Sequence, residues 1–248
     1  MGEGAAWLRP GLECPFNAGT QVIIYRGEIQ MVSFSNDVDI LKYEPMLFGS
    51  LHLPWQVLVS GNDGVLSGTT FTCSGADFES AGVIAGGVIY LLSDNGDIDG
   101  GYEIVSVDSP SQLTVSVVRA DSDEPAVAVG NAEQISYRIS TFRPQAAEAG
   151  FMLTEYFGIA PGNPASDYDG DDIVNPDVLK GAGVCAVISS VYAMLGSKGD
   201  GEGYWKKSLY YKKLLEKAKQ RCRLSIDSDG DGSCDFTRVG ASVRLVRD

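Results

Sequence analysis

The sequence predicts an α+β fold, in which a small antiparallel β-barrel or sandwich precedes a C-terminal three-helix module with an extended C-terminal tail. Two observations lead to this prediction. Six short segments rich in β-branched and aromatic residues, each bounded by turn residues, lie within residues 55–141. From residue 142 onward, apolar residues recur at helical spacing. We therefore expect an N-terminal arm and β-hairpin (1–54), a β-barrel or sandwich domain (55–141), and a helical domain with the C-terminal tail (142–248).

The first 54 residues show the weakest pattern. Residues 1–20 lack periodicity and are rich in Gly, Pro and Ala, which is typical of an arm. Residues 21–25 and 28–34 flank an Arg-Gly pair and predict a hairpin. The stretch that follows, to Pro54, is mixed. It is either an extended region that packs on a neighbouring subunit or a further part of the folded domain.

The β-domain is predicted from alternating apolar residues and from runs of Gly, Asn, Asp, Ser and Pro between them. The candidate strands are residues 56–59, 69–73, 88–92, 102–107, 112–118 and 134–141. The turn signals are residues 61–64, 94–101, 108–110 and 121–125. We expect the aspartates in these loops to be ordinary turn formers.

The first two helices of the C-terminal module have start and stop signals. Thr141 can cap the first helix, Pro144 suits its first turn, and Gly158 can end it. Asn175 and Pro176 give the second helix a cap and a first-turn proline, and it runs to residue 195. This helix is apolar nearly all round, so it is expected at the centre of the bundle.

The third helix, residues 204–224, has two contrasting faces. One face is continuous at a 4-3-4-3-4 spacing and consists of Tyr204, Ser208, Tyr211, Leu215, Ala218 and Cys222. The other face holds eight bases: Lys206, Lys207, Lys212, Lys213, Lys217, Lys219, Arg221 and Arg223. These bases form either a solvated cationic face or a contact with an acidic protein ring or with passing DNA.

Charge is distributed unevenly along the chain. The net charge is −14, which argues against a general nucleic-acid binder, because neutralising phosphates requires an excess of Lys and Arg. Residues 1–140 hold 18 acidic and 5 basic residues, whereas residues 141–248 hold 15 acidic and 14 basic residues. This difference suggests two modules that face different surroundings.

Targeting and redox signals are sparse. The N-terminal residues lack a basic region followed by an apolar run, so no signal peptide is expected. The apolar run 181–195 has 15 residues, and a membrane span needs about 20, so a buried helix is favoured. Five cysteines without a C-x-x-C pair, together with a single histidine, argue against zinc and for reduced thiols in a cytosol.

An acidic loop near the C-terminus matches the first half of a calcium-binding loop. Asp227, Asp229 and Asp231 precede Gly232 at the required spacing, and Asp235 takes the ninth place. The twelfth place, where a bidentate Glu should lie, is Arg238. Two interpretations remain, a weak Ca²⁺ site or an Asx-turn connector, and the turn is favoured. A second acidic cluster, residues 167–172, fits the calcium pattern less well.

Catalytic constellations are not evident in the sequence. The single histidine, His52, lies between two leucines and has no partner that would suggest a catalytic triad. The chain also has no G-x-x-x-x-G-K-[ST] motif for phosphate binding. We therefore expect a protein that is not an enzyme and that needs no cofactor.

The order of features in the last quarter resembles the head–tail connector (adaptor, or head-completion) proteins of tailed bacteriophages. An apolar helix from Val178 to Leu195 precedes a Tyr-rich helix that contains Tyr204-Trp205 and Tyr210-Tyr211. An Asp-x-Asp-Gly-Asp-Gly loop then leads to Arg238 and to a terminal Val-Arg-Leu-Val-Arg. Residues 71–118 are similar to β-modules of phage structural proteins. The resemblance covers about 120 residues and does not include the first 70.

The resemblance implies a structural virion protein at the phage neck, assembled in the host cytoplasm. Such proteins form a ring, typically a dodecamer, that binds the portal protein and a neck or tail-terminator protein and lets DNA pass without reading its sequence. Shorter members of the family are all-helical, so the β-domain would be an insertion. The residues expected to make these contacts are Tyr204, Trp205, Lys206, Lys207, Tyr210, Tyr211, Lys212, Lys213, Arg238, Arg244 and Arg247.

Two other function classes remain open from the sequence. One is a secreted or surface β-protein with a C-terminal module stabilised by a weakly bound cation. The other is a different virion part, such as a tail terminator or a decoration protein. The sequence does not distinguish ring order, the portal-facing surface, or whether a cysteine crosslinks neighbouring copies.

Overall fold

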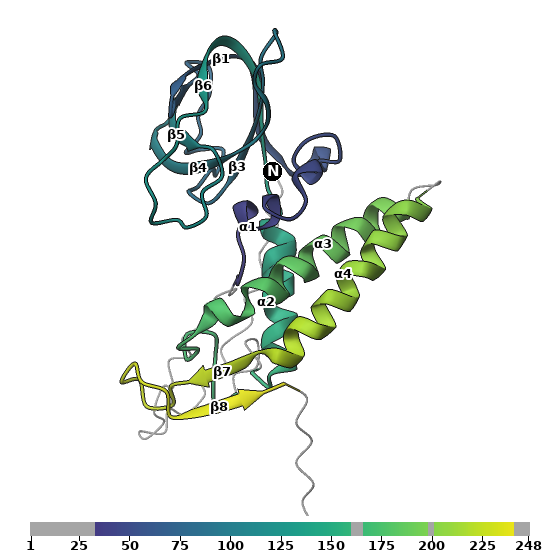
Figure 1. Ribbon diagram of the computed structural model, residues 1–248. Helices are drawn as coiled ribbons and strands as arrows, with labels where there is room; N and C mark the ends of the chain where they lie inside the picture. The colour runs from purple at the N-terminus through teal and green to yellow at the C-terminus, as the bar shows by residue number, and fades with distance from the viewer. Residues whose placement is uncertain (1–32, 160–165, 198–200, 241–248) are drawn as a thin grey trace, which may run out of the picture.

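The computed structural model of the protein describes residues 33–159, 166–197 and 201–240. It has the expected α+β architecture: a six-stranded antiparallel barrel at one end, helices in the middle, and a two-stranded hairpin at the other end (Figure 1). The elements are α1 (Asp37–Leu41), η1 (Pro45–Leu47), η2 (Pro54–Gln56), β1 (Val57–Gly68), β2 (Thr70–Thr72), β3 (Val88–Leu92), β4 (Asp99–Ser109), β5 (Gln112–Ser116), β6 (Gly130–Ser140), α2 (Arg143–Tyr156), η3 (Pro176–Leu179), α3 (Lys180–Gly196), α4 (Glu202–Arg221), β7 (Arg223–Ile226) and β8 (Phe236–Val239).

The barrel is closed in the order β1-β2-β5-β4-β3-β6, and every strand pair is antiparallel. Each of the six predicted strands corresponds to one of these strands. Inward-facing side chains fill the barrel, among them Phe71, Phe78 and Tyr137, whose rings lie 5.1–6.2 Å apart between centroids. Closure removes the exposed edges that an open sheet would leave for unwanted pairing.

The prediction of a turn at residues 61–64 is wrong. Strand β1 continues through this stretch, with shifts of register against β6 on either side of Gly64. A Cβ on Gly64 would lie 2.6 Å from the ring of Phe71, and one on Gly61 would lie 2.7 Å from the ring of Tyr137. These glycines therefore allow two core rings to lie against the strand backbone, which is the other common use of glycine in a strand.

Residues 33–54 belong to the folded core in the part that the structure describes. Asn36 caps α1 through a reciprocal capping box with Asp39. Val38 and Ile40 of α1 are buried, as is Leu47 of η1. Of the two explanations for this stretch, a further part of the folded domain describes these residues. The predicted arm, and the predicted hairpin as far as residue 32, lie outside the described residues.

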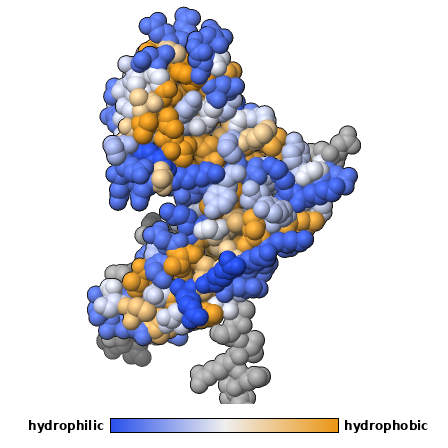
Figure 2. Space-filling view, viewed as in Figure 1, coloured by the Kyte–Doolittle hydropathy of each residue, from blue (hydrophilic) through white to orange (hydrophobic). Residues whose placement is uncertain are grey.

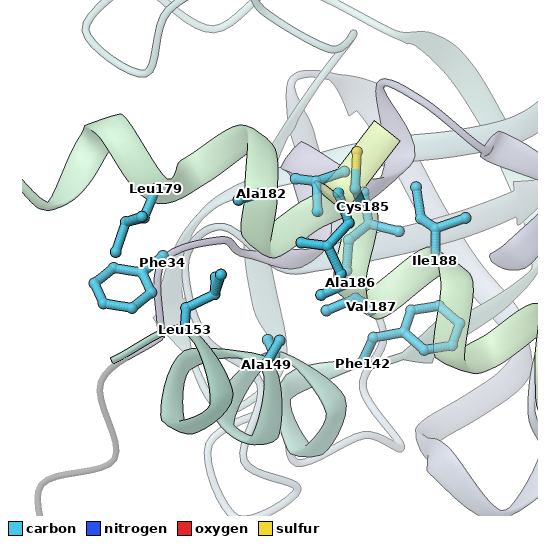
Figure 3. Close-up of a cluster of buried hydrophobic side chains, with 14 of the residues drawn as sticks. Phe34, Phe142, Ala149, Leu153, Leu179, Ala182, Cys185, Ala186, Val187 and Ile188 are labelled. Atoms are coloured by element: carbon cyan, nitrogen blue, oxygen red, sulfur yellow. The ribbon is translucent and has the colours of Figure 1, made fainter. Parts of the chain in front are cut away.

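Helix α3 is the centre of the helical part. Nine of its residues are buried, and α1, α2 and α4 pack around it. Figure 3 shows Phe34, from the N-terminal segment, between Leu179 at the start of this helix and Leu153 of α2. By length and composition, residues 176–196 could cross a membrane, because an 18-residue stretch within them has a mean hydropathy of 1.7. More than half of that stretch is buried inside the protein, as is usual for a core helix.

The first predicted helix agrees with α2 at its end and nearly at its start. Gly158 adopts φ +74° and its N–H donates to the carbonyl of Glu155, so the predicted stop is confirmed. The N-cap is Phe142, not Thr141. The Thr141 hydroxyl still accepts the N–H of Arg143 at 3.1 Å, although Thr141 lies one residue before the N-cap.

Two details of the later helices correct the prediction. The Asn175 side chain does not cap the second helix; its amide bonds to the backbone of Arg223 and Ser225 in β7. The third helix ends at Arg221, because Cys222 is extended and β7 begins at the next residue. Residues 223–239 form the β7–β8 hairpin around the acidic loop, and residues 241–248 lie outside the described residues.

Candidate functional site

Helices α3 and α4 form a tightly packed hairpin that extends beyond the rest of the helical part (Figure 1). The predicted inward face of α4 is confirmed: Ser208, Tyr211 and Leu215 are buried. The hydroxyls of Ser189 and Ser208 each donate to the other residue's carbonyl, at 3.0 and 2.9 Å. Such small residues let the two helix backbones approach closely, so α4 is fixed on its partner and presents its other side to solvent.

The exposed side of α4 combines aromatic, aliphatic and basic residues. Trp205 is 52% exposed, Leu209 is 42% exposed and Tyr210 is 58% exposed. Lysines lie at helical spacing between and beyond them. We define the outer face of α4 as Trp205, Lys206, Leu209, Tyr210, Lys212, Lys213 and Lys217, all of them exposed. Figure 2 shows hydrophilic and hydrophobic side chains side by side along this part of the surface.

The charge of α4 is strongly positive and only partly neutralised. The helix carries seven bases and two acids. Lys206 pairs with Glu202 at 2.7 Å, and Lys219 pairs with Glu216 at 2.7 Å. Within the described residues, Lys212, Lys213 and Lys217 form no ion pair. The outer face therefore offers unpaired positive charge beside exposed aromatic rings.

A polar cluster, buried except for its lysine, attaches the N-terminal segment to the α3–α4 hairpin. The carboxylate of Glu44 accepts hydrogen bonds from the hydroxyls of Tyr192 and Tyr211, at 2.7 and 2.8 Å. Lys207 donates to both oxygens of the same carboxylate, at 2.8 and 3.0 Å. We call these four residues the Glu44 cluster. It fixes the residue before η1 to helices that follow about 150 residues later.

Protonation in the Glu44 cluster follows from its geometry. Burial acts to raise the pKa of the Glu44 carboxyl, but its hydrogen-bond donors outweigh that effect and the net pKa is lowered. Burial, together with the neighbouring carboxylate, raises the pKa of Tyr192 to about 12. Burial lowers the pKa of Lys207, yet its bond to Glu44 leaves the pKa raised overall. At neutral pH the carboxylate is therefore ionised and each of its partners is protonated and able to donate.

The structure divides the predicted interaction residues into two groups. Tyr204 stacks on Tyr192 at 6.0 Å between ring centroids, and Lys207 and Tyr211 belong to the Glu44 cluster. These side chains pack within the chain. The predicted residues on the outer face are Trp205, Lys206, Tyr210, Lys212 and Lys213. Arg244 and Arg247 lie outside the described residues.

Arg238, another of the predicted interaction residues, makes its contacts within the chain. Its Nη1 atom donates to the carbonyl oxygens of Phe157 and Gly158, at 3.1 and 2.7 Å. Its guanidinium lies 5.1 Å from the ring centroid of Tyr168 and 5.8 Å from that of Phe236. A guanidinium at this place donates to the free carbonyls at the C-terminal end of α2 and interacts favourably with the helix dipole. Arg238 thus connects β8 to α2.

The acidic loop between β7 and β8 brings three of its four predicted ligands together. One carboxylate oxygen from each of Asp227, Asp229 and Asp235 lies within 4.8 Å of the other two. Asp231 is not in this group, and its Oδ1 accepts the N–H of Ser233 at 2.7 Å.

Hydrogen bonds inside the acidic loop follow the Asx-turn interpretation. The Asp227 carboxylate accepts the N–H groups of Gly232, at 2.6 Å, and Gly230, at 2.7 Å. These backbone bonds, that from Gly232 first, lower the pKa of Asp227. The second acidic cluster makes similar turn bonds, in which Asp171 donates its N–H to the Asp169 carboxylate.

Two features were not predicted from the sequence. Glu44 lies in the mixed stretch before Pro54, and its partners are 148–167 residues away, so no local pattern indicates it. The buried pair of Arg119 with Glu103, at 2.6 Å, was also missed. The signal in the sequence is that the domain has only two arginines, Arg119 and Arg138, and no lysine. His52 has its Nδ1 atom 3.0 Å from the carbonyl of Gly49.

Comparison of the chain with protein-family models, with curated proteins and with solved structures gives no match in any of the three. The geometry of the chain is therefore the basis for a functional assignment. In the described part of the chain, the outer face of α4 combines unpaired positive charge with exposed aromatic rings.

Proposed function

We propose that the protein is a structural component of a tailed-phage virion, with no chemistry of its own. In this proposal, copies of the chain form a ring at the neck that joins the portal to the tail and lets DNA pass. The helices α2, α3 and α4, with the C-terminal tail, serve as the connector module, and the barrel is an insertion before it. The protein assembles in the host cytoplasm and is located in the virion neck.

The outer face of α4 is the observation on which the proposal rests. Exposed Trp and Tyr side chains are enriched at protein interfaces, and the lysines beside them suit the polar rim of such a contact. The face also belongs to a rigid element, because α4 is fixed on α3 and tied to Glu44. A rigid surface loses little conformational entropy on docking. The proposed partners are neighbouring copies of the chain in the ring, the portal protein and a neck or tail-terminator protein.

The acidic balance of the chain suits a channel for DNA. A net charge of −14 disfavours strong binding to phosphates, so DNA can slide through without being held. Twelve copies, the typical number in the resembling family, would line the path with carboxylates. The basic residues are concentrated in the helical part, where the proposed contacts to protein partners lie.

Reconstitution with the portal protein tests this function. Wild-type protein should bind a purified portal ring, and phage that lack the gene should yield DNA-filled heads without tails. Normal tail attachment in the absence of this protein would refute the proposal. A matched pair of variants, Tyr210→Ala on the outer face and Tyr43→Ala on an exposed site elsewhere, distinguishes loss of docking from general damage.

A second candidate function is a surface or secreted β-protein whose C-terminal hairpin is stabilised by a cation. The three carboxylates within 4.8 Å of one another favour it. Under this alternative, millimolar calcium should raise the melting temperature of the protein, and Asp229→Asn should abolish the rise. Under the neck-ring proposal, calcium should leave the melting temperature of both proteins unchanged.

A further inference from the structure

The barrel carries the opposite charge to α4. Residues 55–141 contain twelve acidic residues, two arginines and no lysine. Both arginines are committed within the chain: Arg119 pairs with Glu103, and Arg138 donates to the carbonyls of Phe48 and Gly49. The barrel itself therefore has almost no cationic group to offset its carboxylates, although Lys42, at the end of α1, donates to the Ala120 carbonyl at 3.3 Å.

One acidic loop of the barrel is held in a fixed shape from the inside. Arg119 is buried with its guanidinium on Glu103, and its Nη1 atom donates to the carbonyls of Ser122, at 2.8 Å, and Glu124. A second brace closes the base of the loop, where the N–H of Val127 donates to the Ser116 hydroxyl at 2.8 Å. A buried ion pair is thus used to set the conformation of an exposed segment.

The braced segment presents acids beside apolar side chains. Asp121, Asp123 and Glu124 are exposed, and so are Val117 and Val127 on either side of them. We call residues 117–127 the acidic loop of the barrel. Its composition is complementary to the outer face of α4, in which exposed apolar side chains lie beside unpaired lysines. A pair of surfaces with complementary charge and apolar patches is suited to specific docking.

We propose that the acidic loop of the barrel in one copy docks on the outer face of α4 in the next copy. This proposal rests on the neck ring proposed above and names the surfaces that build it. The lysines Lys212, Lys213 and Lys217 face Asp121, Asp123 and Glu124, and the valines of the loop cover the exposed rings of Trp205 and Tyr210. Desolvation of those rings accounts for stability, and the charges account for orientation.

A second copy is the occupant that the molecule favours. Within the described residues no ion pair or hydrogen bond joins the acidic loop to α4 of the same chain. Figure 1 shows β4 and β5 on the left of the barrel, whereas the α3–α4 hairpin extends to the right. Because the acidic loop of the barrel and the outer face of α4 belong to different elements, every copy can give one contact and receive another. Such heterologous contacts generate a closed ring when the rotation between copies closes.

Charge reversal tests the contact in both directions. The first variant carries Lys212→Glu, Lys213→Glu and Lys217→Glu on α4, and the second carries Asp123→Lys and Glu124→Lys in the loop. A control carries Glu79→Lys and Glu148→Lys, which reverse two exposed acids elsewhere. Self-association is measured by analytical ultracentrifugation at low and at 0.5 M salt, with and without portal rings, after circular dichroism has confirmed folding.

Each loop or α4 variant should self-associate at least about tenfold more weakly than the wild type, while the control should not change. An equimolar mixture of the two variants should assemble, because the reversed α4 of one then meets the reversed loop of the other. High salt should weaken the wild-type contact.

Three results would overturn the inference. The first is normal self-association of either single variant, and the second is failure of the mixture to assemble. The third is an α4 variant that still self-associates but no longer binds portal, which would make portal the occupant of the outer face. In each of these cases the proposed neck function still stands, provided that the wild-type protein forms rings on the portal. Wild-type protein that forms no ring with portal would instead refute both.

Discussion

Replacing Glu44 is the most informative perturbation of the fold, because one carboxylate joins three elements. In Glu44→Ala the hydroxyls of Tyr192 and Tyr211 lose a charged acceptor in a buried place. Hydrogen bonds to charged groups contribute about 1.5–3 kcal/mol each. Lys207 is 48% exposed and can be rehydrated, so its pairing adds no more than about 1 kcal/mol.

We therefore expect Glu44→Ala to lower the free energy of unfolding by about 3–5 kcal/mol, the range for breaking a buried pair. For a chain of this length the corresponding fall in melting temperature is about 10 °C. Thermal unfolding followed by circular dichroism measures it. Glu133→Ala serves as the control, because Glu133 is exposed and no hydrogen bond to its side chain is found in the described structure.

The pH dependence gives an independent check of the same cluster. The folded pKa of Glu44 lies below its ordinary value, so its stabilisation is present above the unfolded pKa, near 4.5, and is lost as pH falls through the folded pKa. The stability difference between wild type and Glu44→Gln should therefore shrink as pH falls below about 4. A melting temperature of Glu44→Ala equal to that of the control would refute the view that this cluster holds the N-terminal segment in place.

Three further predictions follow from other residues. Burial raises the pKa of Asp37 to about 6, so the native protein binds this proton more tightly than the unfolded chain does. The stability of the wild type therefore falls as pH rises from about 4 to 6. In urea unfolding, Asp37→Asn should be more stable than the wild type by up to about 3 kcal/mol at pH 7 and equally stable at pH 4. Arg238→Ala should cost about 2 kcal/mol, because two carbonyls at the end of α2 lose a charged donor, and faster amide exchange in that last turn should report it. Tyr211→Ala should lose about 3–5 kcal/mol of stability, whereas Tyr210→Ala should unfold like the wild type and lose only self-association, as separate melting and ultracentrifugation assays would show.

The elements of this fold were predictable where a local pattern decides them. The six strands follow from alternation and turn residues, and the inward face of α4 follows from helical spacing. The end of α2 follows from the conformational freedom of Gly158. In each of these places the residues that set the structure are neighbours in the sequence, so pattern and structure agree.

The errors occur where a distant contact overrides the local pattern. Gly61 and Gly64 resemble a turn, but two rings from other strands require glycine at those places in β1. Asn175 resembles a cap, yet its amide bonds to β7, which follows about 50 residues later. Cys222 fits the helical face, but the chain becomes extended there and continues into β7.

The candidate site was predictable in part. The sequence indicates the aromatic and basic residues of α4, and the structure separates the outer face from the residues that pack inward. That separation depends on Glu44, whose partners Lys207 and Tyr211 are far away in the chain. The braced acidic loop of the barrel likewise depends on Arg119 meeting Glu103 from another strand. Long-range polar contacts of this kind leave no periodic signal in a sequence.

Electron microscopy of the purified chain mixed with portal rings tests the proposed function most directly. We expect closed rings of this protein stacked coaxially on the portal, with the acidic loop of the barrel in each copy against the outer face of α4 in its neighbour. Single copies that leave the portal bare would contradict the proposal.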